Sequence, residues 1–234
     1  MSVNLKVLAG VGLLAVAPAS FAQNYSMDLT GVGTGTVADG VYVSPYVGTI
    51  SGPGMSYAGY MICDDFNSEA YLNTPWITTM SNAGALNGTQ KFGEAPGSTI
   101  SFGGSSYTIQ QAYNAAGWLA NGLLANLSNT NVQTNYAFAI WDIFDGQSTD
   151  PNGGAQALEA AAFAAASSGT NPYVAGNVSV FTPSAANSTP ELRDTQEFLV
   201  VHTAPEIDPS VAASGISLLL GGVLVLRGRR KLGA

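Results

Sequence analysis

The stretch SYTIQQAYNAAGWLANGLLANL, residues 106–127, is where the hydrophobic pattern of this chain changes from strand-like to helical. Apolar side chains recur in it at Ile109, Tyr113, Ala116 and Leu119, which is the spacing of one helix face. The chain before this stretch has strand-like patterns, and further helical patterns follow it. The position of this change therefore predicts a fold in which strands and helices are segregated along the chain.

The first half of the chain carries Val, Tyr and Ile between Gly, Pro and Ser, which is typical of short strands. We expect strands within GVYVSPYVGTIS (40–51), MSYAGYMICDDF (55–66) and YLNTPWITTMS (71–81). Pro75 in the last of these favours a sheet edge or a bend, because proline has no backbone donor for a strand ladder.

Two more helical patterns follow, NVQTNYAFAIWDIFDG (131–146) and the alanine-rich GAQALEAAAFAAASSG (154–169). Two strand patterns, NVSVFT (177–182) and TQEFLVVHT (195–203), come after the helices, and a polar loop is expected between them. The order of strands, about three helices and strands predicts an α+β class with antiparallel N-terminal strands. We place this single exported domain at residues 23–203.

The composition excludes several classes of protein. Charged residues make up 9% of the chain, the formal net charge is −8, and 46% of the residues are hydrophobic. Between residues 23 and 204, two basic side chains stand against 13 acidic ones. Such an acidic body repels phosphate backbones, so no nucleic-acid partner is expected. Cys63 is the sole cysteine, which excludes an intramolecular disulfide.

The N-terminal segment, residues 1–22, has the pattern of a signal peptide. Lys6 precedes an apolar run, and small residues lead to an expected cleavage between Ala22 and Gln23. The implied partners are signal peptidase and the secretion machinery. The alternative is a buried N-terminal helix, which Pro18 and the small-residue site disfavour.

The C-terminal segment, residues 204–234, combines a short apolar run with a basic end. Residues 211–226 would span about 24 Å as a helix, a little less than a bilayer core. The positive-inside rule places the basic stop on the cytoplasmic side of a transmembrane helix. That stop consists of Arg227, Arg229, Arg230 and Lys231. An ordinary tail anchor would be enough to explain the apolar run and the basic stop.

PEIDPS, residues 205–210, stands immediately before this helix and makes the tail more specific. The whole tail resembles the PEP-CTERM sorting signal, with Pro205 and Glu206 at its first two positions and Pro209 close behind. Ile207 stands where the family often has a second proline. The resemblance implies an exosortase partner that cuts between Ala204 and Pro209. It also implies transient anchoring in the inner membrane of a Gram-negative bacterium, then delivery to the cell surface or an extracellular matrix of exopolysaccharide or biofilm.

Two motifs in the body resemble the thioester domains of Gram-positive surface adhesins, in which a Cys bonds to a Gln on a later helix. YMICDDF (60–66) is similar to the cysteine motif, and YAFAIW (136–141) is similar to the glutamine motif. Ala137 occupies the Gln position, so no internal thioester is expected there, and Gln133 one turn earlier is a poor substitute. The resemblance implies a thioester-type fold without its bond. The alternatives for Cys63 are a possible reactive thiol and a small buried residue on a strand.

The acidic residues near these motifs are candidate metal ligands or catalytic acids. Asp64 and Asp65 are adjacent, so strand alternation would place them on opposite faces. Asp142, Asp145 and Asp150 flank an Asp-Gly turn that could hold calcium, but a plain helix end explains them more simply. No metal or cofactor is expected.

The expected function is a non-enzymatic surface or matrix protein. A thioester-domain-like adhesin using Cys63 and a polysaccharide-acting enzyme with two carboxylates are the alternatives. His202, the only histidine, lies near the tail and is a poor candidate for a catalytic dyad. Five Asn-x-Ser/Thr sequons mark a polar surface, and they begin at Asn24, Asn87, Asn126, Asn177 and Asn187.

Overall fold

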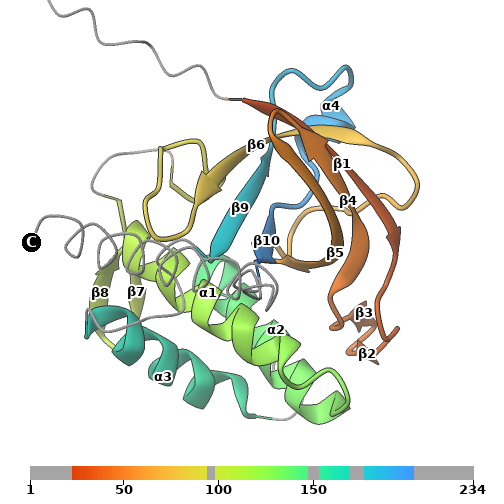
Figure 1. The fold of residues 1–234 in the computed structure, drawn as a ribbon. Helices are drawn as coiled ribbons and strands as arrows, with labels where there is room; N and C mark the ends of the chain where they lie inside the picture. Colours follow the sequence, from red (N-terminus) through yellow and green to blue (C-terminus); the bar gives the residue numbers. More distant parts are fainter. Residues whose placement is uncertain (1–22, 94–97, 147–152, 169–176, 203–234) are drawn as a thin grey trace, which may run out of the picture.

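A computed structural model describes residues 23–93, 98–146, 153–168 and 177–202, which form a β-barrel with a layer of helices beside it (Figure 1). The predicted mixed α+β class is confirmed. The expected signal peptide and the sorting tail lie outside the described residues. Among the helices within the described ranges, none is long and apolar enough to cross a membrane.

Six antiparallel strands close the barrel in the order β1-β4-β5-β10-β9-β6. Pairing of β1 with both β4 and β6 removes the open edges that an unclosed sheet would expose. β10 lies between β5 and β9, so the end of the described chain completes the wall. The strands are β1 (Asn24–Gly31), β4 (Tyr46–Gly52), β5 (Met55–Cys63), β6 (Trp76–Asn82), β9 (Val178–Pro183) and β10 (Phe198–Val201).

Prolines divide one of the predicted strands and delay the start of another. The stretch 40–51 forms two strands rather than one, because Ser44 and Pro45 interrupt the ladder and the Ser44 hydroxyl donates to the Val32 carbonyl oxygen at 2.7 Å. The strand expected over 71–81 begins only at Trp76, directly after Pro75. Two small hairpins complete the strands: β2 (Val37–Ala38) with β3 (Val41–Tyr42), and β7 (Thr99–Phe102) with β8 (Ser105–Thr108).

The three predicted helices are present as α1 (Ile109–Leu124), α2 (Thr130–Asp145) and α3 (Ala155–Ser167). Thr108 and Gln111 form a capping box that starts α1. Gly146, at a φ of 62°, ends α2 in the left-handed conformation that glycine adopts without strain. A fourth, short helix, α4 (Pro190–Arg193), follows the expected polar loop.

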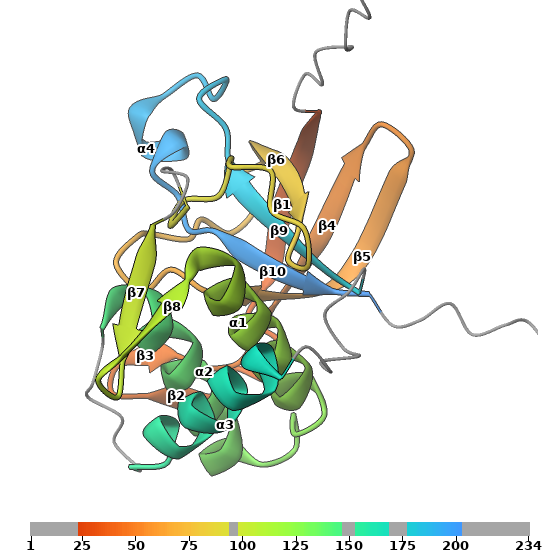
Figure 2. The same cartoon turned by 90° about the vertical axis from the view of Figure 1, so that its left-hand side faces the viewer.

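The hydrophobic core runs from the barrel interior into the helical layer. Alternate side chains of β1, namely Tyr25, Met27 and Leu29, are buried, whereas Ser26 between them is exposed. α1 contacts α2, α3 and β10, so it lies between the barrel and the other helices (Figure 2). The junction of β5, β10 and the helices is where the sequence motifs meet.

Candidate functional site

The end of β5 and the segment after it carry three consecutive polar or sulfur-containing residues into the interior. Cys63 is the last residue of β5 and pairs with Phe198 of β10. Asp64 and Asp65 are 0% and 1% exposed, and their charges interact. The strand ends at Cys63, so both residues lie beyond it, with Asp64 near Glu197 and Asp65 against Lys91.

Cys63 is a free, buried cysteine that is held by its neighbours. Its Sγ donates to the Asp65 carbonyl oxygen at 3.0 Å, and the Trp141 Nε1 donates to the Cys63 carbonyl oxygen at 3.0 Å. Burial and the nearby Asp64 carboxyl raise the pKa of the thiol well above its usual value. The thiol is therefore protonated at neutral pH, which lowers its nucleophilicity.

The two thioester-like motifs come together in space. Cys63, Ala137 and Trp141 line the same small space of about 10 Å³ between β5 and α2. Ala137 brings a methyl group where the adhesin motif has a carboxamide. Gln133 is buried, and its carboxamide is occupied by the Leu127 carbonyl oxygen and, at 3.1 Å, by the Thr34 hydroxyl. Neither residue offers Cys63 a free amide.

A larger cavity of about 360 Å³ adjoins Cys63. Aromatic and polar side chains share its wall, and Tyr42 and Leu72 at its margin are 45% and 42% exposed. Glu69 carries the only carboxylate among the described residues that line it. Tyr46, Trp141 and Gln196 also line this cavity.

A buried acidic cluster lies beside this cavity. Glu197, which is 0% exposed, accepts hydrogen bonds from the Tyr113 and Thr182 hydroxyls and, at 2.8 Å, from the backbone N–H of Lys91. The Asp64 backbone N–H donates to the Glu197 carbonyl oxygen at 3.3 Å. Burial raises the pKa of both the Glu197 and the Asp64 carboxyl groups, and repulsion from Glu197 adds to the rise at Asp64.

Asp145, the last residue of α2, serves local structure. The Asp145 carboxylate accepts from the Phe66 backbone N–H at 2.6 Å and from the Asn67 side chain at 3.0 Å. These bonds tie the segment after β5 to the helix end. Within the described residues no group of acidic, histidine or cysteine side chains has the arrangement of a metal site, and Asp150 lies outside them.

Two further residues singled out in the sequence make their contacts with residues other than Cys63. His202 Nε2 is 2.8 Å from the Ser179 hydroxyl, and its ring packs edge-on against Tyr57. Asn187, the start of a sequon, is 3% exposed and bonds to the backbone of Ile77. The expectation of a surface position is wrong for Asn187, because its amide fastens two segments of backbone together.

Lys91 and Glu197 are the site residues that sequence reasoning missed. Lys91 was visible as one of two basic residues in the acidic body, but nothing in its local pattern indicated a partner. Glu197 stands directly before the apolar run FLVV, where a lone acidic side chain was the available signal of a buried polar role.

The fold and the site define a small closed antiparallel barrel with a helical layer and a buried thiol and acid cluster at their junction. Comparison of the chain with family models, curated proteins and solved structures found no match. The function proposed below therefore depends on the residues and geometry of this chain.

Proposed function

We propose that this chain is an exported, non-enzymatic protein of the cell surface or extracellular matrix of a Gram-negative bacterium, sorted by an exosortase. The observation that carries the proposal is the order of three features in the tail. Pro205-Glu206 precedes the apolar run 211–226, and a basic stop follows that run. The PEP-CTERM signal combines the same features in the same order.

The position of the barrel is compatible with both expected cuts. β1 begins at Asn24, just after the signal-peptidase site, and β10 ends at Val201, before the exosortase region. Cleavage after Ala22 and between Ala204 and Pro209 would leave every barrel strand intact. The apolar run then serves as a transient inner-membrane anchor and not as part of the mature domain.

Intact mass of the protein recovered from the cell surface, with and without the exosortase, tests the sorting. The expected species begins at Gln23 and ends between Ala204 and Pro209 only when the exosortase is present. A variant with Pro205 and Glu206 both replaced by alanine should stay in the inner membrane. A chain that retains residues 227–234 there under both conditions would mean an ordinary tail anchor.

The cavity beside Cys63 is the part of the domain best suited to contact exopolysaccharide. Tyr42, Tyr46 and Trp141 offer aromatic surface, and Glu69 and Gln196 offer hydrogen-bonding groups. Concave sites with apolar walls and a few polar groups are the usual setting for small-molecule recognition. Purely apolar partners would leave these polar groups unpaired.

Binding to the purified exopolysaccharide tests this contact. Tyr42→Ala removes an exposed wall residue and should weaken binding about tenfold, because buried aromatic contacts dominate many interfaces. Val37→Ala is the matched control, since Val37 pairs with Tyr42 in the same hairpin but does not line the cavity. Equal binding by both variants and the wild type would exclude the cavity as the contact.

A covalent adhesin is the second candidate, and the meeting of Cys63 with the YAFAIW motif favours it. Since Ala137 cannot supply an amide, Gln196 is the residue to test: it lines the larger cavity with Cys63, and its buried Oε1 accepts no hydrogen bond within the described residues. Bond formation between Sγ and the Gln Cδ would release ammonia. A mass about 17 Da below the sequence mass, and the full mass in Cys63→Ser, would support the thioester. A free thiol at full mass in the wild type would reject it.

No specific observation favours the third hypothesis, a polysaccharide-acting enzyme. Glycoside hydrolysis ordinarily uses two carboxylates that flank the substrate. Glu69 carries the only carboxylate among the described residues that line the larger cavity. Asp64 and Glu197 are fully buried.

A further inference from the structure

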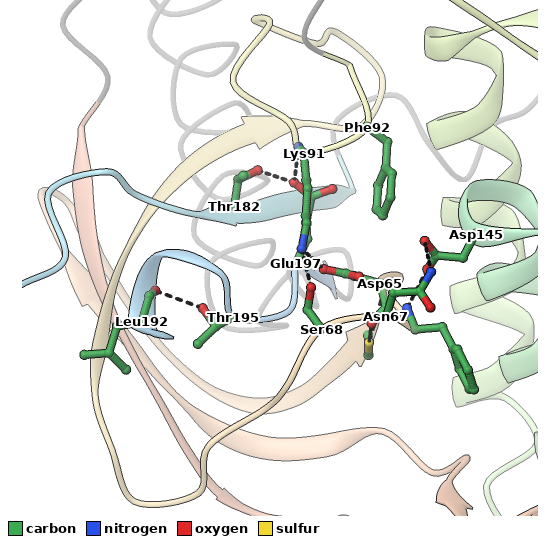
Figure 3. Close-up of polar contacts among 12 residues, drawn as sticks. Asp65, Asn67, Ser68, Lys91, Phe92, Asp145, Thr182, Leu192, Thr195 and Glu197 are labelled. Atoms are coloured by element: carbon green, nitrogen blue, oxygen red, sulfur yellow. Dashed lines mark hydrogen bonds and ion pairs between the residues drawn. The ribbon is translucent and has the colours of Figure 1, made fainter. Parts of the chain in front are cut away.

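Lys91 and Asp65 are in direct contact although they follow different strands. Lys91 lies in the segment after β6, and Asp65 follows β5. The Lys91 Nζ contacts both the Asp65 Oδ2 and the Ser68 Oγ (Figure 3). The Asp65 side chain is 1% exposed and the Lys91 side chain 32% exposed, so the carboxylate meets its partner within the protein.

Both the backbone and the side chain of Lys91 are held by hydrogen bonds. Its backbone N–H donates to the Glu197 Oε2 at 2.8 Å, while its side chain reaches Asp65. Glu197 is in turn fixed by Tyr113 and Thr182. The amine is therefore placed against the carboxyl group without freedom to search other positions, which is the condition under which intramolecular reactions gain most in rate.

The carboxyl side of this contact lies in the interior. Asp64, next to Asp65, is fully buried, and its carboxylate oxygens accept no hydrogen bond within the described residues. Phe92, which follows Lys91, stacks on Phe144 with ring centroids 4.7 Å apart. A charge held in the interior is costly, so an amide, which carries none, suits the buried Asp65 side of this contact.

We propose that Lys91 and Asp65 condense to an intramolecular isopeptide bond between the Nζ and the Asp65 Cγ. The ammonium of Lys91 first gives a proton to the Asp65 carboxylate, which produces an amine and a carboxylic acid. The Nζ lone pair attacks Cγ, the Cγ–OH bond breaks, and a second Nζ proton passes through the Ser68 hydroxyl to the leaving oxygen. The products are a secondary amide and one water, with no oxidant or reductant.

The crosslink would join the end of β5 to the segment after β6. These segments belong to strands that are not neighbours in the barrel. A covalent tie between them resists local opening at this end of the barrel, which suits a protein exposed to extracellular proteases. The bond does not depend on the sorting tail or on Cys63.

Trypsin digestion of the denatured full-length chain tests the bond. Trypsin cuts after unmodified lysine, and Lys91 and Arg193 are the only basic residues between 23 and 204. A crosslinked chain should resist cleavage after Lys91 and yield one peptide ending at Arg193, about 18 Da lighter than its sequence mass. Cleavage after Lys91 with both peptides at full mass would overturn the proposal.

Lys91→Arg is the matched control, because it keeps the positive charge and the trypsin site but cannot form the amide. It should be cut after residue 91 and show no loss of mass. Cys63→Ser should keep the 18 Da loss, which separates this bond from a thioester. Ser68→Ala tests the proton relay and should slow crosslinking after refolding by about tenfold or more. An unchanged rate would overturn that step.

Discussion

The Trp141 indole Nε1 lies 3.0 Å from the carbonyl oxygen of Cys63 and donates a hydrogen bond to it. Both groups are buried, so the bond joins α2 to the end of β5 without competition from water. It also fixes the meeting point of the two motifs that resemble a thioester domain. Removing the indole N–H should therefore weaken the contact between α2 and β5.

Trp141→Phe should lower the free energy of unfolding by about 1–2 kcal/mol, because the buried Cys63 carbonyl loses its donor. Chemical denaturation followed by circular dichroism measures the loss. Trp118→Phe is the control, since Trp118 is a half-buried residue of α1 away from Cys63. Equal losses in the two variants would mean that ring volume and not the hydrogen bond matters.

Cys63 should react with iodoacetamide at least about tenfold more slowly in the native protein than in the unfolded chain. Burial both blocks access and raises the pKa of the thiol, so the thiolate is scarce at neutral pH. Mass spectrometry over a time course gives both rates. Complete labelling of the native protein at the unfolded rate would show an accessible, activated thiol instead.

Glu159→Gln should stabilise the protein at pH 9 by on the order of 1–2 kcal/mol and change little at pH 4. Burial and the nearby Asp142 raise the pKa of Glu159 to about 8. The native state thus binds this proton more tightly than the unfolded state, and stability falls as pH rises from about 4.5 to about 8. Thermal unfolding across this range measures the effect. The exposed control Asp39→Asn should leave the slope unchanged.

Gly122→Ala should destabilise the protein by about 1–3 kcal/mol, although alanine is the better helix former. A Cβ at this position would lie 2.3 Å from the Tyr136 ring, so the ring would have to leave its place between α1 and α2 or the helices would have to separate. The double variant Gly122→Ala with Tyr136→Ala should recover part of the α1–α2 packing. A double-mutant cycle that shows no coupling would contradict this close approach.

Asn187→Ala should cost about 2–3 kcal/mol, because a 3% exposed amide leaves several backbone groups unpaired. Its Oδ1 accepts from the Ile77 N–H at 2.6 Å, and its Nδ2 donates to the Ile77 carbonyl oxygen at 2.8 Å. Urea titration measures the loss. Asn24→Ala, an exposed sequon residue, should fall within about 0.5 kcal/mol of the wild type.

The sequence by itself determined the local elements. The periodicity of residues 106–127 placed α1, and the turn at Gly146 ended α2. These features depend on neighbours within a few residues, so pattern and capping chemistry suffice to predict them. The breaks at Pro45 and Pro75 were local as well, but their effect on strand bounds became plain only when the ladders were in place.

Tertiary structure alone decided which distant residues meet. Insertion of β10 between β5 and β9 brings Glu197 to Asp64, and barrel closure brings the segment carrying Lys91 to Asp65. No periodicity within either segment specifies these partners, because barrel pairing is set by the packing of all six strands together. The sequence supplied the acids, the lysine and the thiol, and the closed barrel brought them together at the edge of an interior where an unpaired charge is costly.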